Sequence, residues 1–353
     1  MIALLLAGLV TTLGLVQQDP SVPKRADSRP TSAAGHEREV YRILKTFQVG
    51  GEGAWDYLAV DSDAHRLYVP RSTRVMVLDT ETGASAGEIP DTSGVHGVAL
   101  ANDLGKGFTS NGRAGTSTVF DLKTLKALKT VPAGKNPDAI VYEPVTKRVF
   151  VCNGTSHDAT AIDAQDLTVA GTIALGGKPE FAVVDGVGKV FVNIEDTNEL
   201  VRIDAKKLEV EQRIKLAPGN EPTGLAIDPA HHRLFAVCHN QKMIVVDAKS
   251  GDVLATPAIG KNVDGAAFDA TGNYALSSNG EGTLSVVATE GDKPFSIAQT
   301  LKTAQGARTM VLDPKTRRIY LPTAEYEASS DTGGARRRPA MKPGSFKIVV
   351  VGA

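Results

Sequence analysis

Residues 222–228, Pro-Thr-Gly-Leu-Ala-Ile-Asp, form a short apolar stretch that ends in an acidic residue, and this stretch decides the fold because it recurs. Seven related heptads run through the chain, at 55–61, 95–101, 137–143, 179–185, 222–228, 263–269 and 307–313. Their last residues are 40 to 44 positions apart. Self-similarity at one such period indicates a repeat architecture, in which each repeat is one structural unit.

Each heptad is the first of four strand-like stretches in its repeat. A second stretch with an aromatic residue follows, as in Arg148-Val-Phe-Val, and then a third that ends in Asp, as in Met243-Ile-Val-Val-Asp. A fourth comes after a glycine-containing turn such as Lys249-Ser-Gly. Four short strands of this kind in every repeat are typical of propeller blades. The sequence therefore predicts an all-β, seven-bladed β-propeller with four-stranded blades over residues 39–353.

The ring is expected to close through an N-terminal strand. The last repeat supplies its third strand at Phe346-Lys-Ile-Val-Val-Val. Residues 39–49, Glu-Val-Tyr-Arg-Ile-Leu-Lys-Thr-Phe-Gln-Val, resemble the fourth strands of the other repeats, yet they precede the first heptad. We expect this N-terminal strand to join the last blade, because that arrangement leaves no long strand edge open.

The residues before the propeller predict export. Residues 2–16 are apolar and uncharged, which is too short for a membrane span of about 20 residues and fits the core of a signal peptide. Residues 1–17 are therefore predicted to be a signal peptide, and residues 18–38, rich in Pro, Ser and Ala, a flexible linker. The predicted location is the periplasm or the cell surface, with no stable membrane span. An uncleaved anchor is the alternative.

Two cysteines occur, Cys152 and Cys238, in the third and fifth repeats. A whole blade would separate them, whereas a disulfide needs Cα atoms within about 7 Å of each other. We therefore expect two buried free thiols.

The composition of the chain argues against nucleic-acid binding and against recognition by aromatic stacking. The formal net charge of −1, from 39 basic and 40 acidic residues, lacks the basic excess that nucleic-acid binders use against phosphates. Aromatic residues make up only 5 %, which argues against a stacking platform for sugars or single strands. The sequence also contains none of the standard catalytic signatures, such as G-x-S-x-G, H-E-x-x-H or a P-loop.

One face of the predicted ring collects ionisable side chains. In a propeller, the loop into the innermost strand and the loop between the second and third strands lie on the same face, around the central channel. We call the second residue of each heptad its mouth position, and these positions hold Asp56, His96, Asp138, Glu180, Thr223, Asp264 and Arg308. Ionisable groups that converge on a concavity favour a binding site. The alternative is that they only satisfy backbone groups of the loops.

Loops after the second strands add polar residues to the same face. These are Arg71, Asn111, Asn153, His157, Asn193, Glu195, His239, Asn240, Asn279, Glu281 and Glu325. The predicted ligand-binding set is Asp56, His96, Asp138, Glu180, Asp264, Arg308, His239, Asn240 and Glu281. Because crowded carboxylates favour a cation and imidazole with carboxylate suits a transition metal, the candidate cofactor is a divalent metal ion. Its candidate ligands are His96, Asp138, Glu180 and His239; no catalytic residue is assigned.

The last repeat carries an insertion at residues 326–345, on this same face. It contains few large apolar side chains and a basic cluster, Arg336, Arg337 and Arg338. One interpretation is a solvated loop. The other is a lid, or a contact with an anionic partner such as nucleic acid.

These repeats resemble the YVTN-repeat (YncE-like) family of bacterial seven-bladed β-propellers. The resemblance covers roughly residues 39–353 and rests on the repeat length, the Val-x-Val-x-Asp third strands and altered forms of the family tetrad, at Tyr68-Val-Pro, Phe150-Val-Cys-Asn and Tyr320-Leu-Pro-Thr. It implies an exported protein of the periplasm or cell surface with a binding or scaffold role. DNA binding is known for some members, and no catalytic motif defines the family.

Three function hypotheses follow. The leading one is a monomeric, exported binding or scaffold protein that takes a small molecule, protein or peptide at the channel face. The alternative is a metal-dependent hydrolase or lactonase with a divalent ion at the channel mouth, by analogy with other propellers. A weaker alternative is DNA binding, for which affinity would fall steeply with salt.

Overall fold

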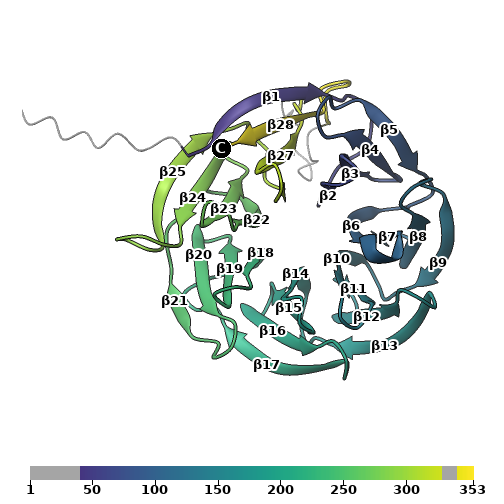
Figure 1. Ribbon diagram of the computed structural model, residues 1–353, viewed down its shortest axis with the longest axis horizontal. Coiled ribbons are helices and arrows are strands. Elements are labelled where there is room, and N and C mark those ends of the chain that lie inside the picture. Colours follow the sequence, from purple (N-terminus) through teal and green to yellow (C-terminus); the bar gives the residue numbers. More distant parts are fainter. Residues whose placement is uncertain (1–39, 328–339) are drawn as a thin grey trace, which may run out of the picture. The chain divides into compact units, whose positions relative to one another are not determined.

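The computed structural model describes residues 40–327 and 340–353. The strands of these residues form seven four-stranded antiparallel sheets that stand around a ring (Figure 1). The predicted seven-bladed β-propeller with four-stranded blades is therefore confirmed. The predicted signal peptide (1–17), the linker (18–38) and the basic cluster Arg336, Arg337 and Arg338 lie outside the described residues.

The first four blades follow one another along the chain. The first contains β2 (Ala59–Asp61), β3 (Arg66–Arg71), β4 (Arg74–Asp79) and β5 (Ser85–Ile89). The second contains β6 (Val95–Ala101), β7 (Lys106–Asn111), β8 (Thr116–Asp121) and β9 (Ala127–Pro132), with the short 3₁₀ helix η1 (Asn102–Leu104). The third contains β10 (Pro137–Glu143), β11 (Arg148–Asn153), β12 (Asp158–Asp163) and β13 (Thr168–Ala174). The fourth contains β14 (Pro179–Val184), β15 (Lys189–Ile194), β16 (Glu199–Asp204) and β17 (Glu209–Lys215).

The last three blades complete the ring. The fifth contains β18 (Pro222–Asp228), β19 (Arg233–Cys238), β20 (Lys242–Asp247) and β21 (Val253–Ala255). The sixth contains β22 (Val263–Asp269), β23 (Tyr274–Asn279), β24 (Thr283–Ala288) and β25 (Ser296–Lys302). The seventh contains β26 (Val311–Asp313), β27 (Arg318–Thr323), β28 (Lys347–Gly352) and, as its outermost strand, β1 (Arg42–Gln48).

The core lies between neighbouring blades. The second strand of a blade is buried on both faces, as in β11, whereas the outermost strand is largely exposed, as in β13. Phe150 of β11 belongs to the same buried cluster as Val192 and Val201 of the next blade. A short apolar run with little alternation is typical of a strand covered on both faces, and β11 and β15 have this pattern.

Two first strands are shorter than the sequence pattern predicts. The heptads at 55–61 and 307–313 form strand only from Ala59 and from Val311. Continuing the register of each pair would set Pro70 opposite residue 57 and Pro322 opposite residue 309. Proline has no N–H to donate to the ladder, so the pairing stops before it.

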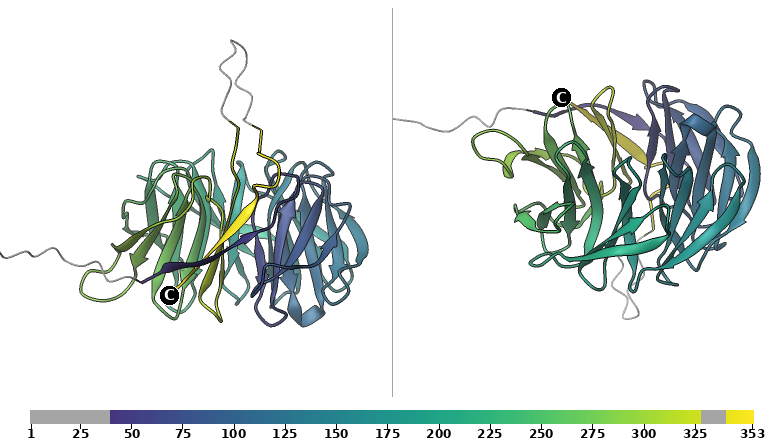
Figure 2. Two further views of the ribbon diagram at one scale, coloured as in Figure 1. Left: turned by 90° about the horizontal axis from the view of Figure 1, so that it is seen from above. Right: turned by 60° about the horizontal axis from the view of Figure 1, so that its bottom comes forward.

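The N-terminal strand closes the ring, as predicted. β1 pairs antiparallel with β28, and the two strands lie side by side in the wall of the propeller (Figure 2). At one end of β1, the side chain of Gln299 accepts a hydrogen bond from the backbone N–H of Tyr41 and donates one to its carbonyl, both at 2.8 Å. The hydroxyl of Tyr41 also donates to Asp269. The strand is therefore tied to the sixth blade as well as to the seventh.

The other end of β1 is held by Arg71 of the first blade. This side chain is fully buried and donates hydrogen bonds of 3.0 Å to the carbonyl oxygens of Gly50, Gly51 and Gly53. Its guanidinium also lies over the ring of Phe346, 3.9 Å from the ring centre. One arginine thus fixes the turn between the closing strand and the first blade.

Both cysteines are buried free thiols, as predicted. Cys152 lies in β11 and Cys238 in β19, and neither side chain is exposed. Burial raises the pKa of the Cys238 thiol to about 12. Within residues 40–327 and 340–353, no helix has the length and apolar character needed to cross a membrane.

Candidate functional site

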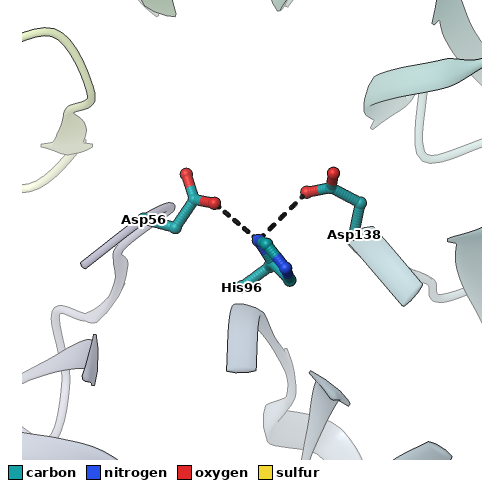
Figure 3. A group of neighbouring side chains, drawn as sticks. All are labelled: Asp56, His96 and Asp138. Atoms are coloured by element: carbon teal, nitrogen blue, oxygen red, sulfur yellow. Dashed lines mark hydrogen bonds and ion pairs between the residues drawn. The ribbon is translucent and has the colours of Figure 1, made fainter. Parts of the chain in front are cut away.

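The structure sets three mouth positions of neighbouring blades against one another. His96 and Asp138 are the second residues of β6 and β10, and Asp56 precedes β2. Their side chains converge on one point at the mouth of the channel (Figure 3). The heptads of neighbouring blades share one register, so their second residues lie at the same end of the channel, even though strand β2 begins only at Ala59.

The three groups are close enough to share one ion. Nδ1 of His96 lies 2.7 Å from Oδ2 of Asp56 and 3.6 Å from Oδ1 of Asp138. One ligand atom from each of the three residues lies within 4.8 Å of the others. Among the described residues, this is the one group of histidine, cysteine and acidic side chains that meets this spacing. We call it the Asp–His–Asp cluster.

Asp138 is the most buried member of the cluster. It is 8 % exposed, and within the described part of the chain its carboxylate accepts no hydrogen bond. Burial raises its pKa well above the ordinary value, the nearby charges of Asp56 and Glu180 raise it further, and His96 opposes the shift. A buried carboxylate without donors is costly, so this position favours a proton or a cation.

His96 is held in its charged form. Burial lowers its pKa, but the hydrogen bond to Asp56 and the negative charges of Asp138, Asp56 and Glu180 outweigh burial and raise the pKa to about 9. The imidazolium is therefore the counter-ion of the two aspartates at neutral pH when no metal is bound. A single positive charge faces two carboxylates there.

Two glycines leave room around the cluster. A Cβ atom at position 112 would lie 2.7 Å from Nε2 of His96 and 2.9 Å from Oδ1 of Asn136. A Cβ atom at Gly154 would lie 3.1 Å from Nδ2 of Asn136 and 3.9 Å from Oδ2 of Asp138. The amide of Asn136 thus lies beside the cluster, and Gly112 gives the imidazole ring the space that it occupies.

The opposite side of the mouth consists of ion pairs. Lys178 lies 3.0 Å from Oε2 of Glu180 and also pairs with Glu195. Nε of Arg308 lies 3.1 Å from Oδ2 of the buried Asp264. Burial nevertheless raises the pKa of Asp264 to about 7, against the opposing effect of Arg308 and with a contribution from the charges of Asp56 and Glu180.

Tyr57 bridges the channel. Its hydroxyl donates a hydrogen bond of 3.2 Å to Oε1 of Glu180, and its ring packs edge-on against Phe181 with the ring centres 4.7 Å apart. Burial raises the pKa of Tyr57, as do the charges of Asp264 and Glu180 and those of both aspartates of the cluster. The first and fourth blades thus meet across the axis through Tyr57, Glu180 and Phe181.

The sequence interpretation missed Tyr57 and Phe181. Both occupy the third position of their heptads, where the remaining repeats have the smaller residues Gly97, Ala139, Gly224, Gly265 and Thr309. Two large aromatic side chains at an otherwise small position are the signal that could have revealed a plug in the channel. Lys178 and Asn136 were also missed, since each precedes its heptad by one residue.

Several predicted binding residues serve the loops instead of the cluster. His239 pairs with Glu221 at 3.0 Å in an exposed part of the fifth blade. The side chain of Asn240 donates to the carbonyl of Pro218 at 2.7 Å, and Glu281 accepts from the hydroxyl of Thr283 at 3.1 Å. The structure therefore brings His96 and Asp138 together with Asp56, and it does not place His239, Asn240 or Glu281 in the Asp–His–Asp cluster.

Asparagines at the ends of second strands have a structural role. Each amide donates to side chains at the start of the next strand: Asn111 to Thr118 at 2.9 Å, Asn153 to Thr160 at 3.0 Å and Asn279 to Ser285 at 3.0 Å. All three asparagines are buried. These three asparagines therefore hold the second and third strands of their blades together through side-chain hydrogen bonds.

Two recesses open near the mouth. One, of about 160 Å³, is lined by Trp55, Asp56, Ser72, Gly94, His96 and Arg113, and so gives access to the Asp–His–Asp cluster. The other, of about 590 Å³, lies beside the base of the insertion and is lined by Gln305, Thr323, Glu325, Tyr326, Lys342 and Lys347. The first recess places a ligand in direct reach of two members of the cluster.

Comparison with known proteins supports the fold. No family model matches the chain, and no curated protein matches its sequence. Among solved structures, the chain is similar to hydrazine synthase of Kuenenia stuttgartiensis, with a TM-score of 0.67 at 14 % sequence identity, over 78 % of this chain and 92 % of that chain. At this identity the likeness concerns the fold alone. It supports the seven-bladed β-propeller and assigns no activity to the chain.

Proposed function

We propose that the protein is an exported binding protein of the YVTN-repeat (YncE-like) kind. In this proposal the channel mouth holds a positively charged group of a small molecule or peptide. The observation that carries it is the convergence of acidic side chains from four blades on one mouth: Asp56, Asp138, Glu180 and Asp264. The apolar run at residues 2–16 and the altered tetrads such as Tyr68-Val-Pro support export and the family assignment.

The charge balance of the mouth favours a cationic ligand. The pKa values of Asp138, Glu180 and Asp264 are all raised, mainly because of burial and despite the positive charges of His96, Lys178 and Arg308, respectively. Carboxylates whose charge is this poorly compensated gain when a further positive group approaches them. A concave, acidic mouth also attracts cations from solution.

Binding of defined cations tests this proposal. The probes are spermidine and a Lys–Arg dipeptide, with citrate as the anionic comparison, and calorimetric titration of metal-stripped protein measures their affinity. We expect saturable binding of the cations and none of citrate. Glu180→Gln should weaken the binding, since it removes one negative charge from the mouth.

A matched control lies on the other face of the ring. Asp63 is exposed in the turn between β2 and β3 and pairs with Lys315, so Asp63→Asn removes the same charge far from the mouth. The Asp63→Asn variant should bind the cations with the same affinity as the unmodified protein. Equal loss in both variants, or tighter binding of citrate, would contradict the proposal.

A metal-dependent hydrolase is the second candidate. It is favoured by the Asp–His–Asp cluster and by the recess of about 160 Å³ that opens onto Asp56 and His96. Bound ions supply a nucleophile by lowering the pKa of a water molecule, and this requires open coordination positions. Lactone and ester hydrolysis that appears with Zn²⁺ or Mn²⁺ and disappears with a chelator would support it; metal-loaded protein without such activity would exclude it.

DNA binding stays a weaker prediction. The residues that would carry it, Arg336, Arg337 and Arg338, lie outside the described residues, and the acidic mouth would repel phosphates. Binding of a DNA duplex at several salt concentrations tests it. The prediction requires an affinity that falls steeply as salt rises.

A further inference from the structure

The Asp–His–Asp cluster combines two kinds of donor. His96 offers an imidazole nitrogen, and Asp56 and Asp138 each offer a carboxylate oxygen, from three consecutive blades (Figure 3). Ligands bonded at about 2.0–2.2 Å to one ion in a tetrahedral arrangement lie about 3.3 Å from one another. The separations of 2.7 Å and 3.6 Å from Nδ1 of His96 lie on either side of that value. The ligand atoms of Asp56 and Asp138 lie within 4.8 Å of each other, so all three side chains must adjust their positions to seat an ion.

Asp138 provides a second, independent observation. Asp138 is a buried residue with 12 % of its side chain exposed, and its carboxylate points into the cluster and accepts no hydrogen bond from the described residues (Figure 3). Its partner His96 already hydrogen-bonds to Asp56, so one imidazole cannot serve both aspartates equally. Buried carboxylates are normally paired or bound to a metal, and here the pairing within the protein is incomplete.

The surroundings give the cluster room and a path to solvent. Gly112 leaves space for the ring of His96, and Gly154 leaves space for Asn136, whose amide lies beside both His96 and Asp138. The recess lined by Trp55, Asp56 and His96 connects the cluster to the surface. An ion could enter there, and a water molecule or ligand could fill its remaining positions.

We propose that Asp56, His96 and Asp138 bind one divalent first-row transition-metal ion, with Nδ1 of His96 and one oxygen of each aspartate as its protein ligands. A mixed set of imidazole and carboxylates suits Zn²⁺ or Mn²⁺ better than Mg²⁺ or Ca²⁺, which prefer oxygen donors alone. Three protein ligands leave coordination positions open, as in sites that bind a further ligand.

This set differs from the one that the sequence suggests. It adds Asp56 and leaves out Glu180, which pairs with Lys178, and His239, which pairs with Glu221. The inference concerns the metal alone and does not depend on the cationic ligand proposed for the mouth. A protein that binds the metal and no spermidine, or the reverse, would separate the two proposals.

Titration with metal alone tests the site. The full chain is stripped with a chelator and then titrated calorimetrically with Zn²⁺, Mn²⁺ and Mg²⁺. We expect one ion per chain, with Zn²⁺ bound more tightly than Mn²⁺, as the Irving–Williams order requires, and Mg²⁺ weakest. Asp138→Asn and Asp56→Asn should each lower the Zn²⁺ affinity about tenfold or more, a loss at least as large as that from outer-shell changes.

His231 supplies the matched control. Its Nδ1 lies 2.7 Å from Oδ2 of Asp228, the same separation as in the His96–Asp56 pair, but the described structure places no second carboxylate of a three-residue group beside it. His231→Ala should therefore leave the stoichiometry and the Zn²⁺ affinity unchanged. If Zn²⁺ binding survives in folded Asp138→Asn and Asp56→Asn, or falls equally in His231→Ala, the proposed site is wrong.

A variant that removes no ligand adds a geometric test. Gly112→Ala places a methyl group against the ring of His96, so it should displace the imidazole and weaken Zn²⁺ binding while all three ligands remain. Circular dichroism verifies that each variant is folded before titration. Unchanged affinity in Gly112→Ala would mean that His96 does not bind through the arrangement proposed here, and that result would overturn the assignment of Nδ1.

Discussion

The hydroxyl of Tyr57 donates a hydrogen bond to Glu180 across the mouth of the channel, and so connects the first blade to the fourth at 3.2 Å. Phe181, also of the fourth blade, packs against the tyrosine ring. The contact therefore joins two blades that are three positions apart in the ring of seven.

Tyr57→Phe should lower the free energy of unfolding by about 1 kcal/mol, because it removes one buried hydrogen bond while keeping the ring. Urea unfolding followed by circular dichroism measures the change. Tyr326→Phe is the control, since Tyr326 is half-exposed and its hydroxyl makes no hydrogen bond within the described residues. Equal effects in the two variants would contradict a specific role of the Tyr57–Glu180 contact.

The raised pKa of Asp264 predicts a pH-dependent stability. Its pKa is about 7 in the folded protein, mainly because of burial, and about 3.9 in the unfolded chain. The folded state therefore binds more protons between these values, and this group makes the free energy of unfolding fall as pH rises from about 4 to about 7.

Asp264→Asn removes this contribution. The unfolding free energy of the variant, relative to the unmodified protein, should rise by up to about 1.4 kcal/mol per pH unit across that window. Urea unfolding at pH 4.5, 6 and 7.5 measures it. Asp269→Asn is the control: the hydrogen bonds from Arg317 and Tyr41 outweigh burial and lower the pKa of Asp269, so its pH dependence lies below about pH 4 and the difference should stay nearly constant at these three pH values. A constant difference for Asp264→Asn at all three pH values would refute the assignment.

His96 should titrate near pH 9 in the metal-free protein. Burial lowers its pKa, but the Asp56 hydrogen bond and the charge of Asp138 prevail. The stability that its charge contributes is fully present below about pH 6.5, the unfolded value, and is lost as pH rises through 9. NMR of the imidazole protons measures the pKa directly. Asp56→Asn should bring it down towards the ordinary value; an unchanged pKa in that variant would argue against the pair.

Arg71 should be one of the most sensitive positions outside the core. Arg71→Met leaves the carbonyl oxygens of Gly50, Gly51 and Gly53 without their donor, and the expected loss of unfolding free energy is about 3 kcal/mol or more. Arg74→Met is the matched control, since Arg74 forms only a partly exposed pair with Glu88, whose loss costs about 1 kcal/mol or less. Thermal unfolding of both variants distinguishes the two roles.

The fold was predictable because every repeat carries the same signal. An apolar heptad and an aromatic second strand recur seven times, and six of the seven heptads end in an acidic residue, so the other repeats correct an error made in any one of them. The mouth positions follow from the same register, and Asp56, His96 and Asp138 were found in this way. The shortened β2 was missed because Pro70 acts through a pairing partner that the local pattern does not include.

The detailed site was less predictable, since contacts between blades depend on side-chain size and on loop geometry. His239 looked equivalent to His96, but it follows the end of β19 at Cys238, and its ring turns to Glu221. Glu180 looked like a metal ligand, but its carboxylate turns to Lys178, two residues earlier, and lies outside the Asp–His–Asp cluster. Neither neighbour could be identified from the repeat period, because both lie outside the heptad positions.

The closing strand imposes an order on the making of the protein. β1 is among the first parts of the propeller to be synthesised, yet its partner β28 is the last, and the Tyr41–Gln299 bonds join residues 258 positions apart. Blades one to six can form as the chain emerges, whereas the pairing of β1 with β28 that closes the ring requires the final strand. Until then β1 lacks the strand that it pairs with in its sheet, so the seventh blade is the last to be completed.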